Sequence, residues 1–177
     1  VYGGLMAALF EETGRYIAMR FLVKPMDFPN AFMYGAGHGG VEAMLLCGVA
    51  SISNIASAVM INSGTMSAQL ATLDAEKAAD TAAALSALWT TPSLTFFAGG
   101  VERIIAVVLH LSLSILVFQS IRKKSRKDLL NAYLFHFVID SLSVLLSAVA
   151  SVWVVELVVA LVTGGAVLMA KYACREE

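Results

Sequence analysis

The sequence has few charged residues. Only 14% of its 177 residues are Asp, Glu, Lys or Arg, and 59% are hydrophobic, with a mean hydropathy of +0.79. A soluble domain carries about 25% charged and about 45–50% apolar residues. This composition predicts an all-α, polytopic membrane protein. The formal net charge of −1 leaves no basic surface for phosphates, which argues against a nucleic-acid partner.

Cysteine and proline are also scarce. Cys47 and Cys174 are the two cysteines of the sequence, so neither a disulfide framework nor a thiolate metal cage is indicated. All three prolines fall in expected connections between helices, where helix-breaking residues belong. The sequence starts at Val1 inside an apolar run, so we expect a fragment that lacks upstream helices, with residues 1–177 forming a single membrane domain.

Long apolar runs define the expected spans. About 20 apolar residues cross the hydrocarbon core as a helix, which predicts about five membrane-spanning helices in one bundle. They lie near residues 1–22, 35–62, 96–121, 129–150 and 152–173. The Ala-rich stretch 63–95 is too polar to span comfortably. We expect it to form an extra amphipathic or re-entrant interfacial helix anchored by Trp89.

The basic residues predict the orientation. The short loop "IRKKSRK" at 121–127 carries five positive charges and should be cytoplasmic. Threading from this loop places Arg20 and Lys24, and the C-terminus with Lys171 and Arg175, on the same side. Stretch 63–95 is then extracytoplasmic, and the protein is a multi-pass protein of the plasma membrane.

Ionisable residues inside the expected spans form a pattern. An ionised group at the centre of a bilayer costs at least about 2.5–3.5 kcal/mol, so each needs a partner or a function. Within each span they recur at helical spacing, on one face. Counted at 1.5 Å per residue, most lie about 10–16 Å from the cytoplasmic end of their helix. The set comprises Glu11, Glu12 and Arg15; His38 and Glu42; Arg103, His110 and Ser114; and His136 and Asp140.

Structural roles compete with functional ones for single residues. Arg15 is most simply the counter-charge of Glu11 at i and i+4, and an isolated His110 could be a helix-packing donor. Gly35, Gly37, Gly39 and Gly40 around His38 should permit close helix approach. The whole set of carboxylates and all three histidines of the sequence is harder to explain by packing.

Such a set suits hydrolysis inside a membrane. A buried carboxylate can take a proton from water and return it, and a neutral imidazole can orient that water or stabilise an oxyanion. Two histidines and a carboxylate could alternatively hold Zn²⁺, in which case His38, His110 and His136 are the candidate ligands. The motif H-E-x-x-H is absent, so we expect no cofactor, with zinc as the less favoured alternative.

Four ordered motifs carry a resemblance. "FEETGRY", "YGAGHGGVEAML", "GGVERIIAVVLHLSLS" and "HFVIDS" closely resemble the bacterial YhfC-type family of glutamic intramembrane proteases, which is similar to the CAAX-protease/Abi (CPBP) and PrsW-like families. The resemblance implies an integral protein of the bacterial inner membrane that cleaves a membrane protein or peptide. Glu11 or Glu12 would activate water. His38, with His110 or His136, would stabilise the oxyanion.

The same resemblance implies supporting residues. Arg15 would steady the paired glutamates, Asp140 would orient His136, and Glu42 and Arg103 would support the site. A rival interpretation is a non-enzymatic channel, transporter or scaffold that uses these residues as a proton relay or as helix-packing contacts. A third interpretation is a degenerate family member that only binds substrates.

Overall fold

The structure is a computed structural model that describes residues 1–175. Within this range every regular element is helical, so the expected all-α fold is confirmed. The helices, in chain order, are α1 (Tyr2–Ile17), α2 (Phe28–Ala43), α3 (Val49–Asn62), α4 (Thr65–Leu70), α5 (Ala75–Thr90), α6 (Ser93–Lys123), α7 (Arg126–Ser147) and α8 (Val152–Arg175). π-helical turns follow α1 (Ala18–Leu22) and α2 (Met44–Gly48).

Four helices of the described chain are long and apolar enough to cross a membrane: Phe28–Asn62, Ser93–Lys123, Arg126–Ser147 and Val152–Arg175. They coincide with four of the five expected spans. The fifth, residues 1–22, corresponds to α1 and its π turn. It is absent from the four because it carries too many charged residues, Glu11, Glu12, Arg15 and Arg20, although the 16 residues of α1 and the five of its π turn are together long enough to span.

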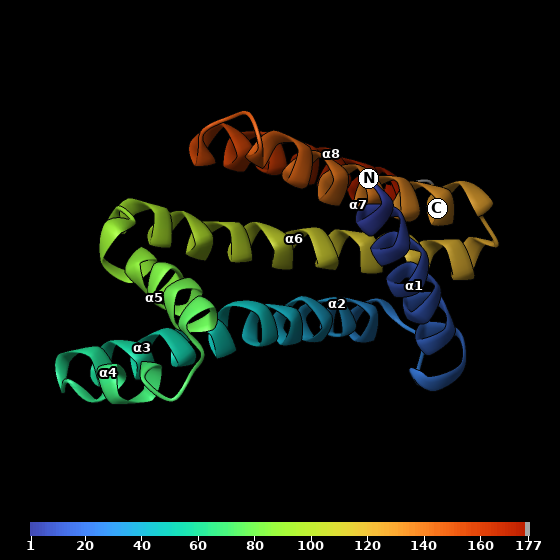
Figure 1. The fold of residues 1–177 in the computed structure, drawn as a ribbon. Helices are drawn as coiled ribbons and strands as arrows, with labels where there is room; N and C mark the ends of the chain where they lie inside the picture. Colours follow the sequence, from blue (N-terminus) through green and yellow to red (C-terminus); the bar gives the residue numbers. More distant parts are fainter. Residues whose placement is uncertain (176–177) are drawn as a thin grey trace. The chain divides into compact units, whose positions relative to one another are not determined.

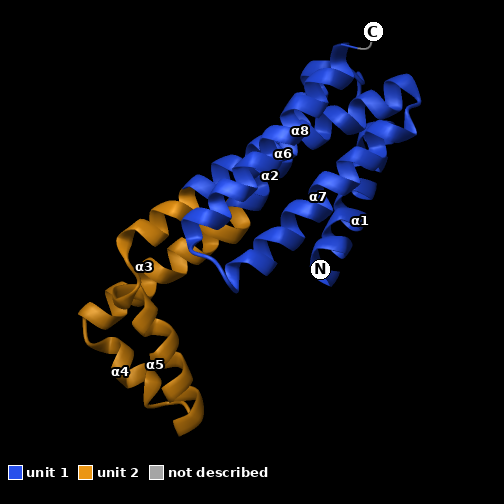
Figure 2. Cartoon of the chain, turned by 90° about the horizontal axis from the view of Figure 1, so that it is seen from above, with its two compact units in different colours: residues 1–43, 101–177 blue, residues 44–100 orange. Residues whose placement is uncertain are grey.

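The chain divides into two compact units, residues 1–43 with 101–177 and residues 44–100 (Figure 2); residues 176–177 of the expected single domain lie outside the described range. In the second unit, the expected interfacial stretch 63–95 contains two short helices, α4 and α5. Gly64 adopts a left-handed φ of 76° at the turn before α4. Asp74 caps α5, and the hydrogen bond from the Lys77 backbone N–H lowers the pKa of Asp74.

In the first unit α6 contributes the largest share of the described core. Leu113, Leu116 and Val117 of this helix are fully buried, while α2 and α8 run alongside it (Figure 1). Helix α7 packs against α1 and α8. Ser125 caps α7 by accepting a hydrogen bond from the Asp128 backbone N–H. The bundle thereby brings together the inner faces of α1, α2, α6 and α7.

Two glycines set the spacing between α2 and α6. A Cβ at Gly35 would lie 2.9 Å from the Leu111 Cα, and one at Gly39 would lie 3.0 Å from the Val107 Cα. Close approach of these two helices was expected from the sequence and is confirmed at both positions. Gly37, on the outer face of α2, has open space where its Cβ would be, so it does not take part.

We therefore expect Gly35→Ala to destabilise the protein by about 1–3 kcal/mol, because the added methyl group forces backbone out of place. Gly37→Ala is the matched control and should be neutral or slightly stabilising, since alanine is the better helix former. Thermal unfolding midpoints in detergent would check this. Equal midpoints for the two variants would contradict the close approach of α2 and α6.

Candidate active site

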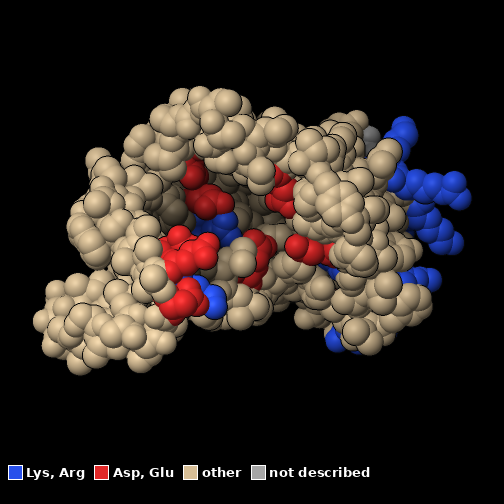
Figure 3. Space-filling view, in the orientation of Figure 1, with Lys and Arg blue, Asp and Glu red and all other residues tan. Residues whose placement is uncertain are grey.

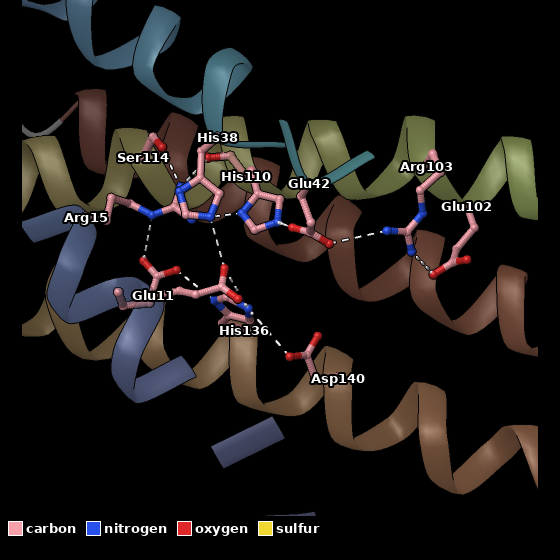
Figure 4. A network of polar contacts seen from close by, with 11 residues as sticks. Glu11, Arg15, His38, Glu42, Glu102, Arg103, His110, Ser114, His136 and Asp140 are labelled. Carbon is pink, nitrogen blue, oxygen red and sulfur yellow. Dashed lines mark hydrogen bonds and ion pairs between the residues drawn. The ribbon is translucent and has the colours of Figure 1, made fainter. Parts of the chain in front are cut away.

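Side chains from four helices meet in the first unit (Figure 4). The i, i+4 pattern of each helix turns its polar residues to one face, and these four faces converge. Helix α1 supplies Glu11, Glu12 and Arg15, α2 supplies His38 and Glu42, α6 supplies Arg103, His110 and Ser114, and α7 supplies His136 and Asp140. All ten residues that the sequence singled out lie in this one network.

Arg15 lies at the centre of the buried side of the network. Its side chain is fully buried, and its Nε is 3.1 Å from Glu12 Oε2 in an ion pair without aligned hydrogen-bond geometry. The expectation that Arg15 pairs with Glu11 is therefore wrong. Adjacent residues of a helix point in different directions, and Glu12, three residues before Arg15, is the one that packs inward with the guanidinium.

The other nitrogens of Arg15 fix His110. Nη1 donates to the His110 carbonyl oxygen (2.8 Å) and to Ser114 Oγ (2.5 Å), and Nη2 lies 2.8 Å from His110 Nδ1. A guanidinium can only donate, so Nδ1 must accept and the ring proton must be on Nε2. That nitrogen is 2.5 Å from Glu42 Oε2, to which it donates.

Each carboxylate oxygen of Glu12 lies next to a basic side chain. While Oε2 faces Arg15, Oε1 lies 2.8 Å from His136 Nδ1. The Nε2 of His136 then points between Asp140 (3.5 Å) and Glu11 (3.8 Å). The two adjacent glutamates of α1 thus differ: Glu12 is fully buried and paired, whereas the Glu11 side chain is 35% exposed.

Four residues could hold a metal ion. Glu11, His38, Glu42 and His110 each offer one ligand atom, and these atoms all lie within 4.8 Å of one another. We call these four residues the donor cluster. His38 Nε2 is 3.0 Å from Glu11 Oε2, and its ring stacks on His110 with centroids 4.7 Å apart. The set differs from the three histidines that the sequence suggested, since two carboxylates take the place of His136.

Arg103 connects the donor cluster to a further carboxylate. Arg103 Nη1 is 3.3 Å from Glu42 Oε1, and the other terminal nitrogen of Arg103 pairs with Glu102. Glu102 is not among the site residues predicted from the sequence, although it directly precedes Arg103. In the structure Arg103 links Glu102 to the donor cluster.

A cavity of about 80 Å³ borders the network and has room for water. Glu11, Glu42, His110, His136 and Asp140 all line it. Ser143 also lines it and is not among the site residues predicted from the sequence. Its position three residues after Asp140 and seven after His136 places it on the same helical face, a signal by which it could have been found.

The fold and this network define a polytopic α-helical membrane protein with a cluster of carboxylates and imidazoles inside its bundle. Residues 1–159 match the family described as "YhfC intramembrane metalloprotease". The chain belongs to this family. It is also 38% identical over 165 residues to the "Uncharacterized membrane protein YhfC" of Bacillus subtilis (strain 168), which covers 92% of this chain and 63% of that protein.

The chain thus spans less than two thirds of the length of this curated relative. No solved structure matches the chain. The family resemblance predicted from the four motifs is confirmed. The description of the family as metalloproteases makes a metal possible at the donor cluster, so the expected absence of a cofactor is not confirmed.

We expect Arg15→Met to destabilise the protein by about 3–5 kcal/mol, because it leaves Glu12 as a buried carboxylate without its guanidinium. The double variant Arg15→Met/Glu12→Gln should recover part of this loss. Unfolding in detergent, followed for both single variants and the double variant, measures the coupling. Additive effects would show that the pair is energetically independent.

Proposed function

We propose that this chain carries the catalytic centre of an intramembrane endopeptidase, which hydrolyses a peptide bond of a membrane protein or peptide in or near the bilayer. The observation that carries this proposal is the donor cluster, two imidazoles and two carboxylates within reach of one ion or one water molecule. The adjoining cavity supplies space for that water. The family's description supports the same class of reaction.

The donor cluster fits a divalent metal in ligand type and in charge. Imidazole and carboxylate are the ligands of catalytic zinc. Among the residues of the network, five carboxylates (Glu11, Glu12, Glu42, Glu102 and Asp140) face only two guanidinium groups (Arg15 and Arg103). Excess negative charge in a low-dielectric bundle is costly, so a bound cation would offset it.

His38, His110 and Glu42 would hold this ion. When bound, a divalent metal such as Zn²⁺ polarises the peptide carbonyl and lowers the pKa of its bound water. To offer Nε2 to the ion, His110 would have to lose the proton that this nitrogen now donates to Glu42, and because Nδ1 accepts from Arg15 the ring would then bind as an imidazolate and not as the usual neutral imidazole. The Arg15 guanidinium at Nδ1 would offset the negative charge left on the ring.

Glu11 is then the general base. It lines the cavity, is partly exposed, and has His38 as its nearest partner. Glu12 is less suited because both of its oxygens are engaged and no solvent reaches it. Glu11 would take a proton from the attacking water and deliver it to the leaving amine. Glu12 would act as a positioning residue that holds His136 beside the cavity.

A metal-free glutamic mechanism is the second candidate, and one observation favours it. Arg15 occupies His110 Nδ1 and so makes Nε2 a hydrogen-bond donor. A neutral imidazole donor of this kind can stabilise a developing oxyanion. In this version Glu11 keeps its role and His110 replaces the ion as the electrophile. The two versions therefore differ in metal content and in sensitivity to chelators.

We expect Glu11→Gln to lower peptide cleavage by about 10²–10⁴-fold, because the amide keeps the shape of the side chain but cannot accept the proton. Cleavage of a membrane-peptide library by the full-length protein in proteoliposomes is the measurement. Glu76→Gln, the same exchange at an exposed position on α5, is the matched control and should be silent. Full activity of Glu11→Gln would remove Glu11 as the base.

Metal binding can be tested without any substrate. We expect the purified protein to bind about one Zn²⁺ with His38, His110 and Glu42 as ligands, and we expect His38→Ala and Glu42→Gln to lose it. His136→Ala should retain it, because His136 is outside the donor cluster. Calorimetric titration and elemental analysis give the stoichiometry.

The results of these experiments distinguish the metal-dependent mechanism, the metal-free mechanism and the non-enzymatic interpretation. Loss of zinc in His136→Ala but not in Glu42→Gln would assign the ion to the three histidines instead. Cleavage without bound metal, unaffected by chelators, would favour the glutamic version. A protein that neither binds metal nor cleaves any peptide would favour the proton-relay or binding interpretation.

A further inference from the structure

A second polar cavity lies at the other end of α1, beyond the donor cluster. It measures about 320 Å³, within the range of roughly 300–1,000 Å³ that is typical of small-molecule sites. Arg20 from the π turn after α1, Lys124 from the α6–α7 connection and Arg126 from the start of α7 line it. Three cations from two separate stretches of the chain therefore meet at one cavity.

These cations have no protein partner in the described chain. Between residues 1 and 175, no carboxylate lines the cavity, and Arg20, Lys124 and Arg126 take part in no hydrogen bond or ion pair. The contrast with the donor cluster is clear, since Arg15 and Arg103 there are both paired with glutamates. All three residues are exposed to solvent, and their grouping around one cavity without a carboxylate gives that cavity a positive charge that suits an anionic ligand.

The remaining lining residues narrow the chemistry of that ligand. Tyr16 and Ser125 contribute hydroxyl groups, which bind phosphate oxygens well, and arginine binds phosphate through two parallel hydrogen bonds. Ile121 and Leu129 add apolar wall on the α6 and α7 sides. A free phosphate makes no apolar contacts, whereas the first methylene groups of a lipid would pack against this apolar wall.

The location also favours a lipid. Several Lys and Arg side chains gather at one end of the first unit (Figure 3), and α6 has Arg122 and Lys123 in its last turn. The positive-inside rule places this end at the cytoplasmic surface, where anionic lipids attract basic residues and bind basic pockets between membrane helices. A headgroup at this surface is within reach of the cavity.

We propose that this cavity binds the phosphate group of an anionic phospholipid such as phosphatidylglycerol, with Arg20 and Arg126 as the main contacts. The site is distinct from the donor cluster, and its occupancy does not depend on the proposed protease activity. A bound lipid would connect the π turn after α1 to the α6–α7 connection, the two stretches that form the cavity.

The test titrates phosphatidylglycerol into the full-length protein in a neutral detergent, where no membrane surface potential contributes, and counts bound lipids by native mass spectrometry. We expect Arg20→Gln and Arg126→Gln each to weaken binding by at least about tenfold, the loss of one charge-assisted hydrogen bond. Lys127→Gln and Lys171→Gln remove exposed cations that do not line the cavity. These matched controls should stay within about twofold.

Further results test both the site and the identity of its ligand. Zwitterionic phosphatidylcholine should bind at least about tenfold more weakly than phosphatidylglycerol, because its choline repels the cations. Arg20→Lys should restore part of the affinity lost in Arg20→Gln, which a misfolded variant would not do. Equal losses in the control variants would overturn the site, and displacement of the lipid by millimolar inorganic phosphate would overturn its assignment to a lipid.

Discussion

The buried guanidinium of Arg15 is the constraint on which the rest of the polar network depends. A cation with no access to water inside an apolar bundle must find an acceptor for every donor it carries. Its two terminal nitrogens donate to His110 and Ser114 on α6, and Glu12 on its own helix supplies the counter-charge at Nε. These contacts join α1 to α6 and determine which nitrogen of His110 carries the proton. The donor cluster is thus arranged by a residue that is not part of it.

Much of the fold could be predicted, because a bilayer imposes simple rules on length and polarity. Apolar runs of about 20 residues located four helices. The orientation expected from the basic loops stays a prediction. The first span could not be judged in the same way. Its charged residues, Glu11, Glu12, Arg15 and Arg20, distinguish the helix formed by α1 and its π turn from the four apolar membrane-crossing helices.

The membership of the network could also be predicted, because helical spacing alone turns these side chains to common faces. The partners within it could not. Glu11 and Glu12 are both within helical reach of Arg15, and only the packing of α1 against α7 and α6 decides that Glu12 turns inward. Similarly, the pairing of His38 and His110 across α2 and α6 depends on how closely Gly35 and Gly39 let the helices approach. Neither the inward orientation of Glu12 nor the distance between α2 and α6 follows from local residue spacing.

The π turn at Ala18–Leu22 has a consequence for how α1 is phased. A π turn holds an extra residue compared with an α-helical turn, so side chains beyond it are rotated by roughly 100° from the positions that a regular helix would give them. Arg15 precedes this turn and Arg20 lies within it. In a regular α-helix two side chains five residues apart point roughly 140° away from each other. The extra residue of the π turn rotates Arg20 back toward the face of Arg15, so one continuous helix holds one arginine in the buried network and the next, on a neighbouring face, at the cavity beyond the end of α1. Deletion of one residue from the turn would preserve this relation, because two residues four apart in a regular helix also point in similar directions.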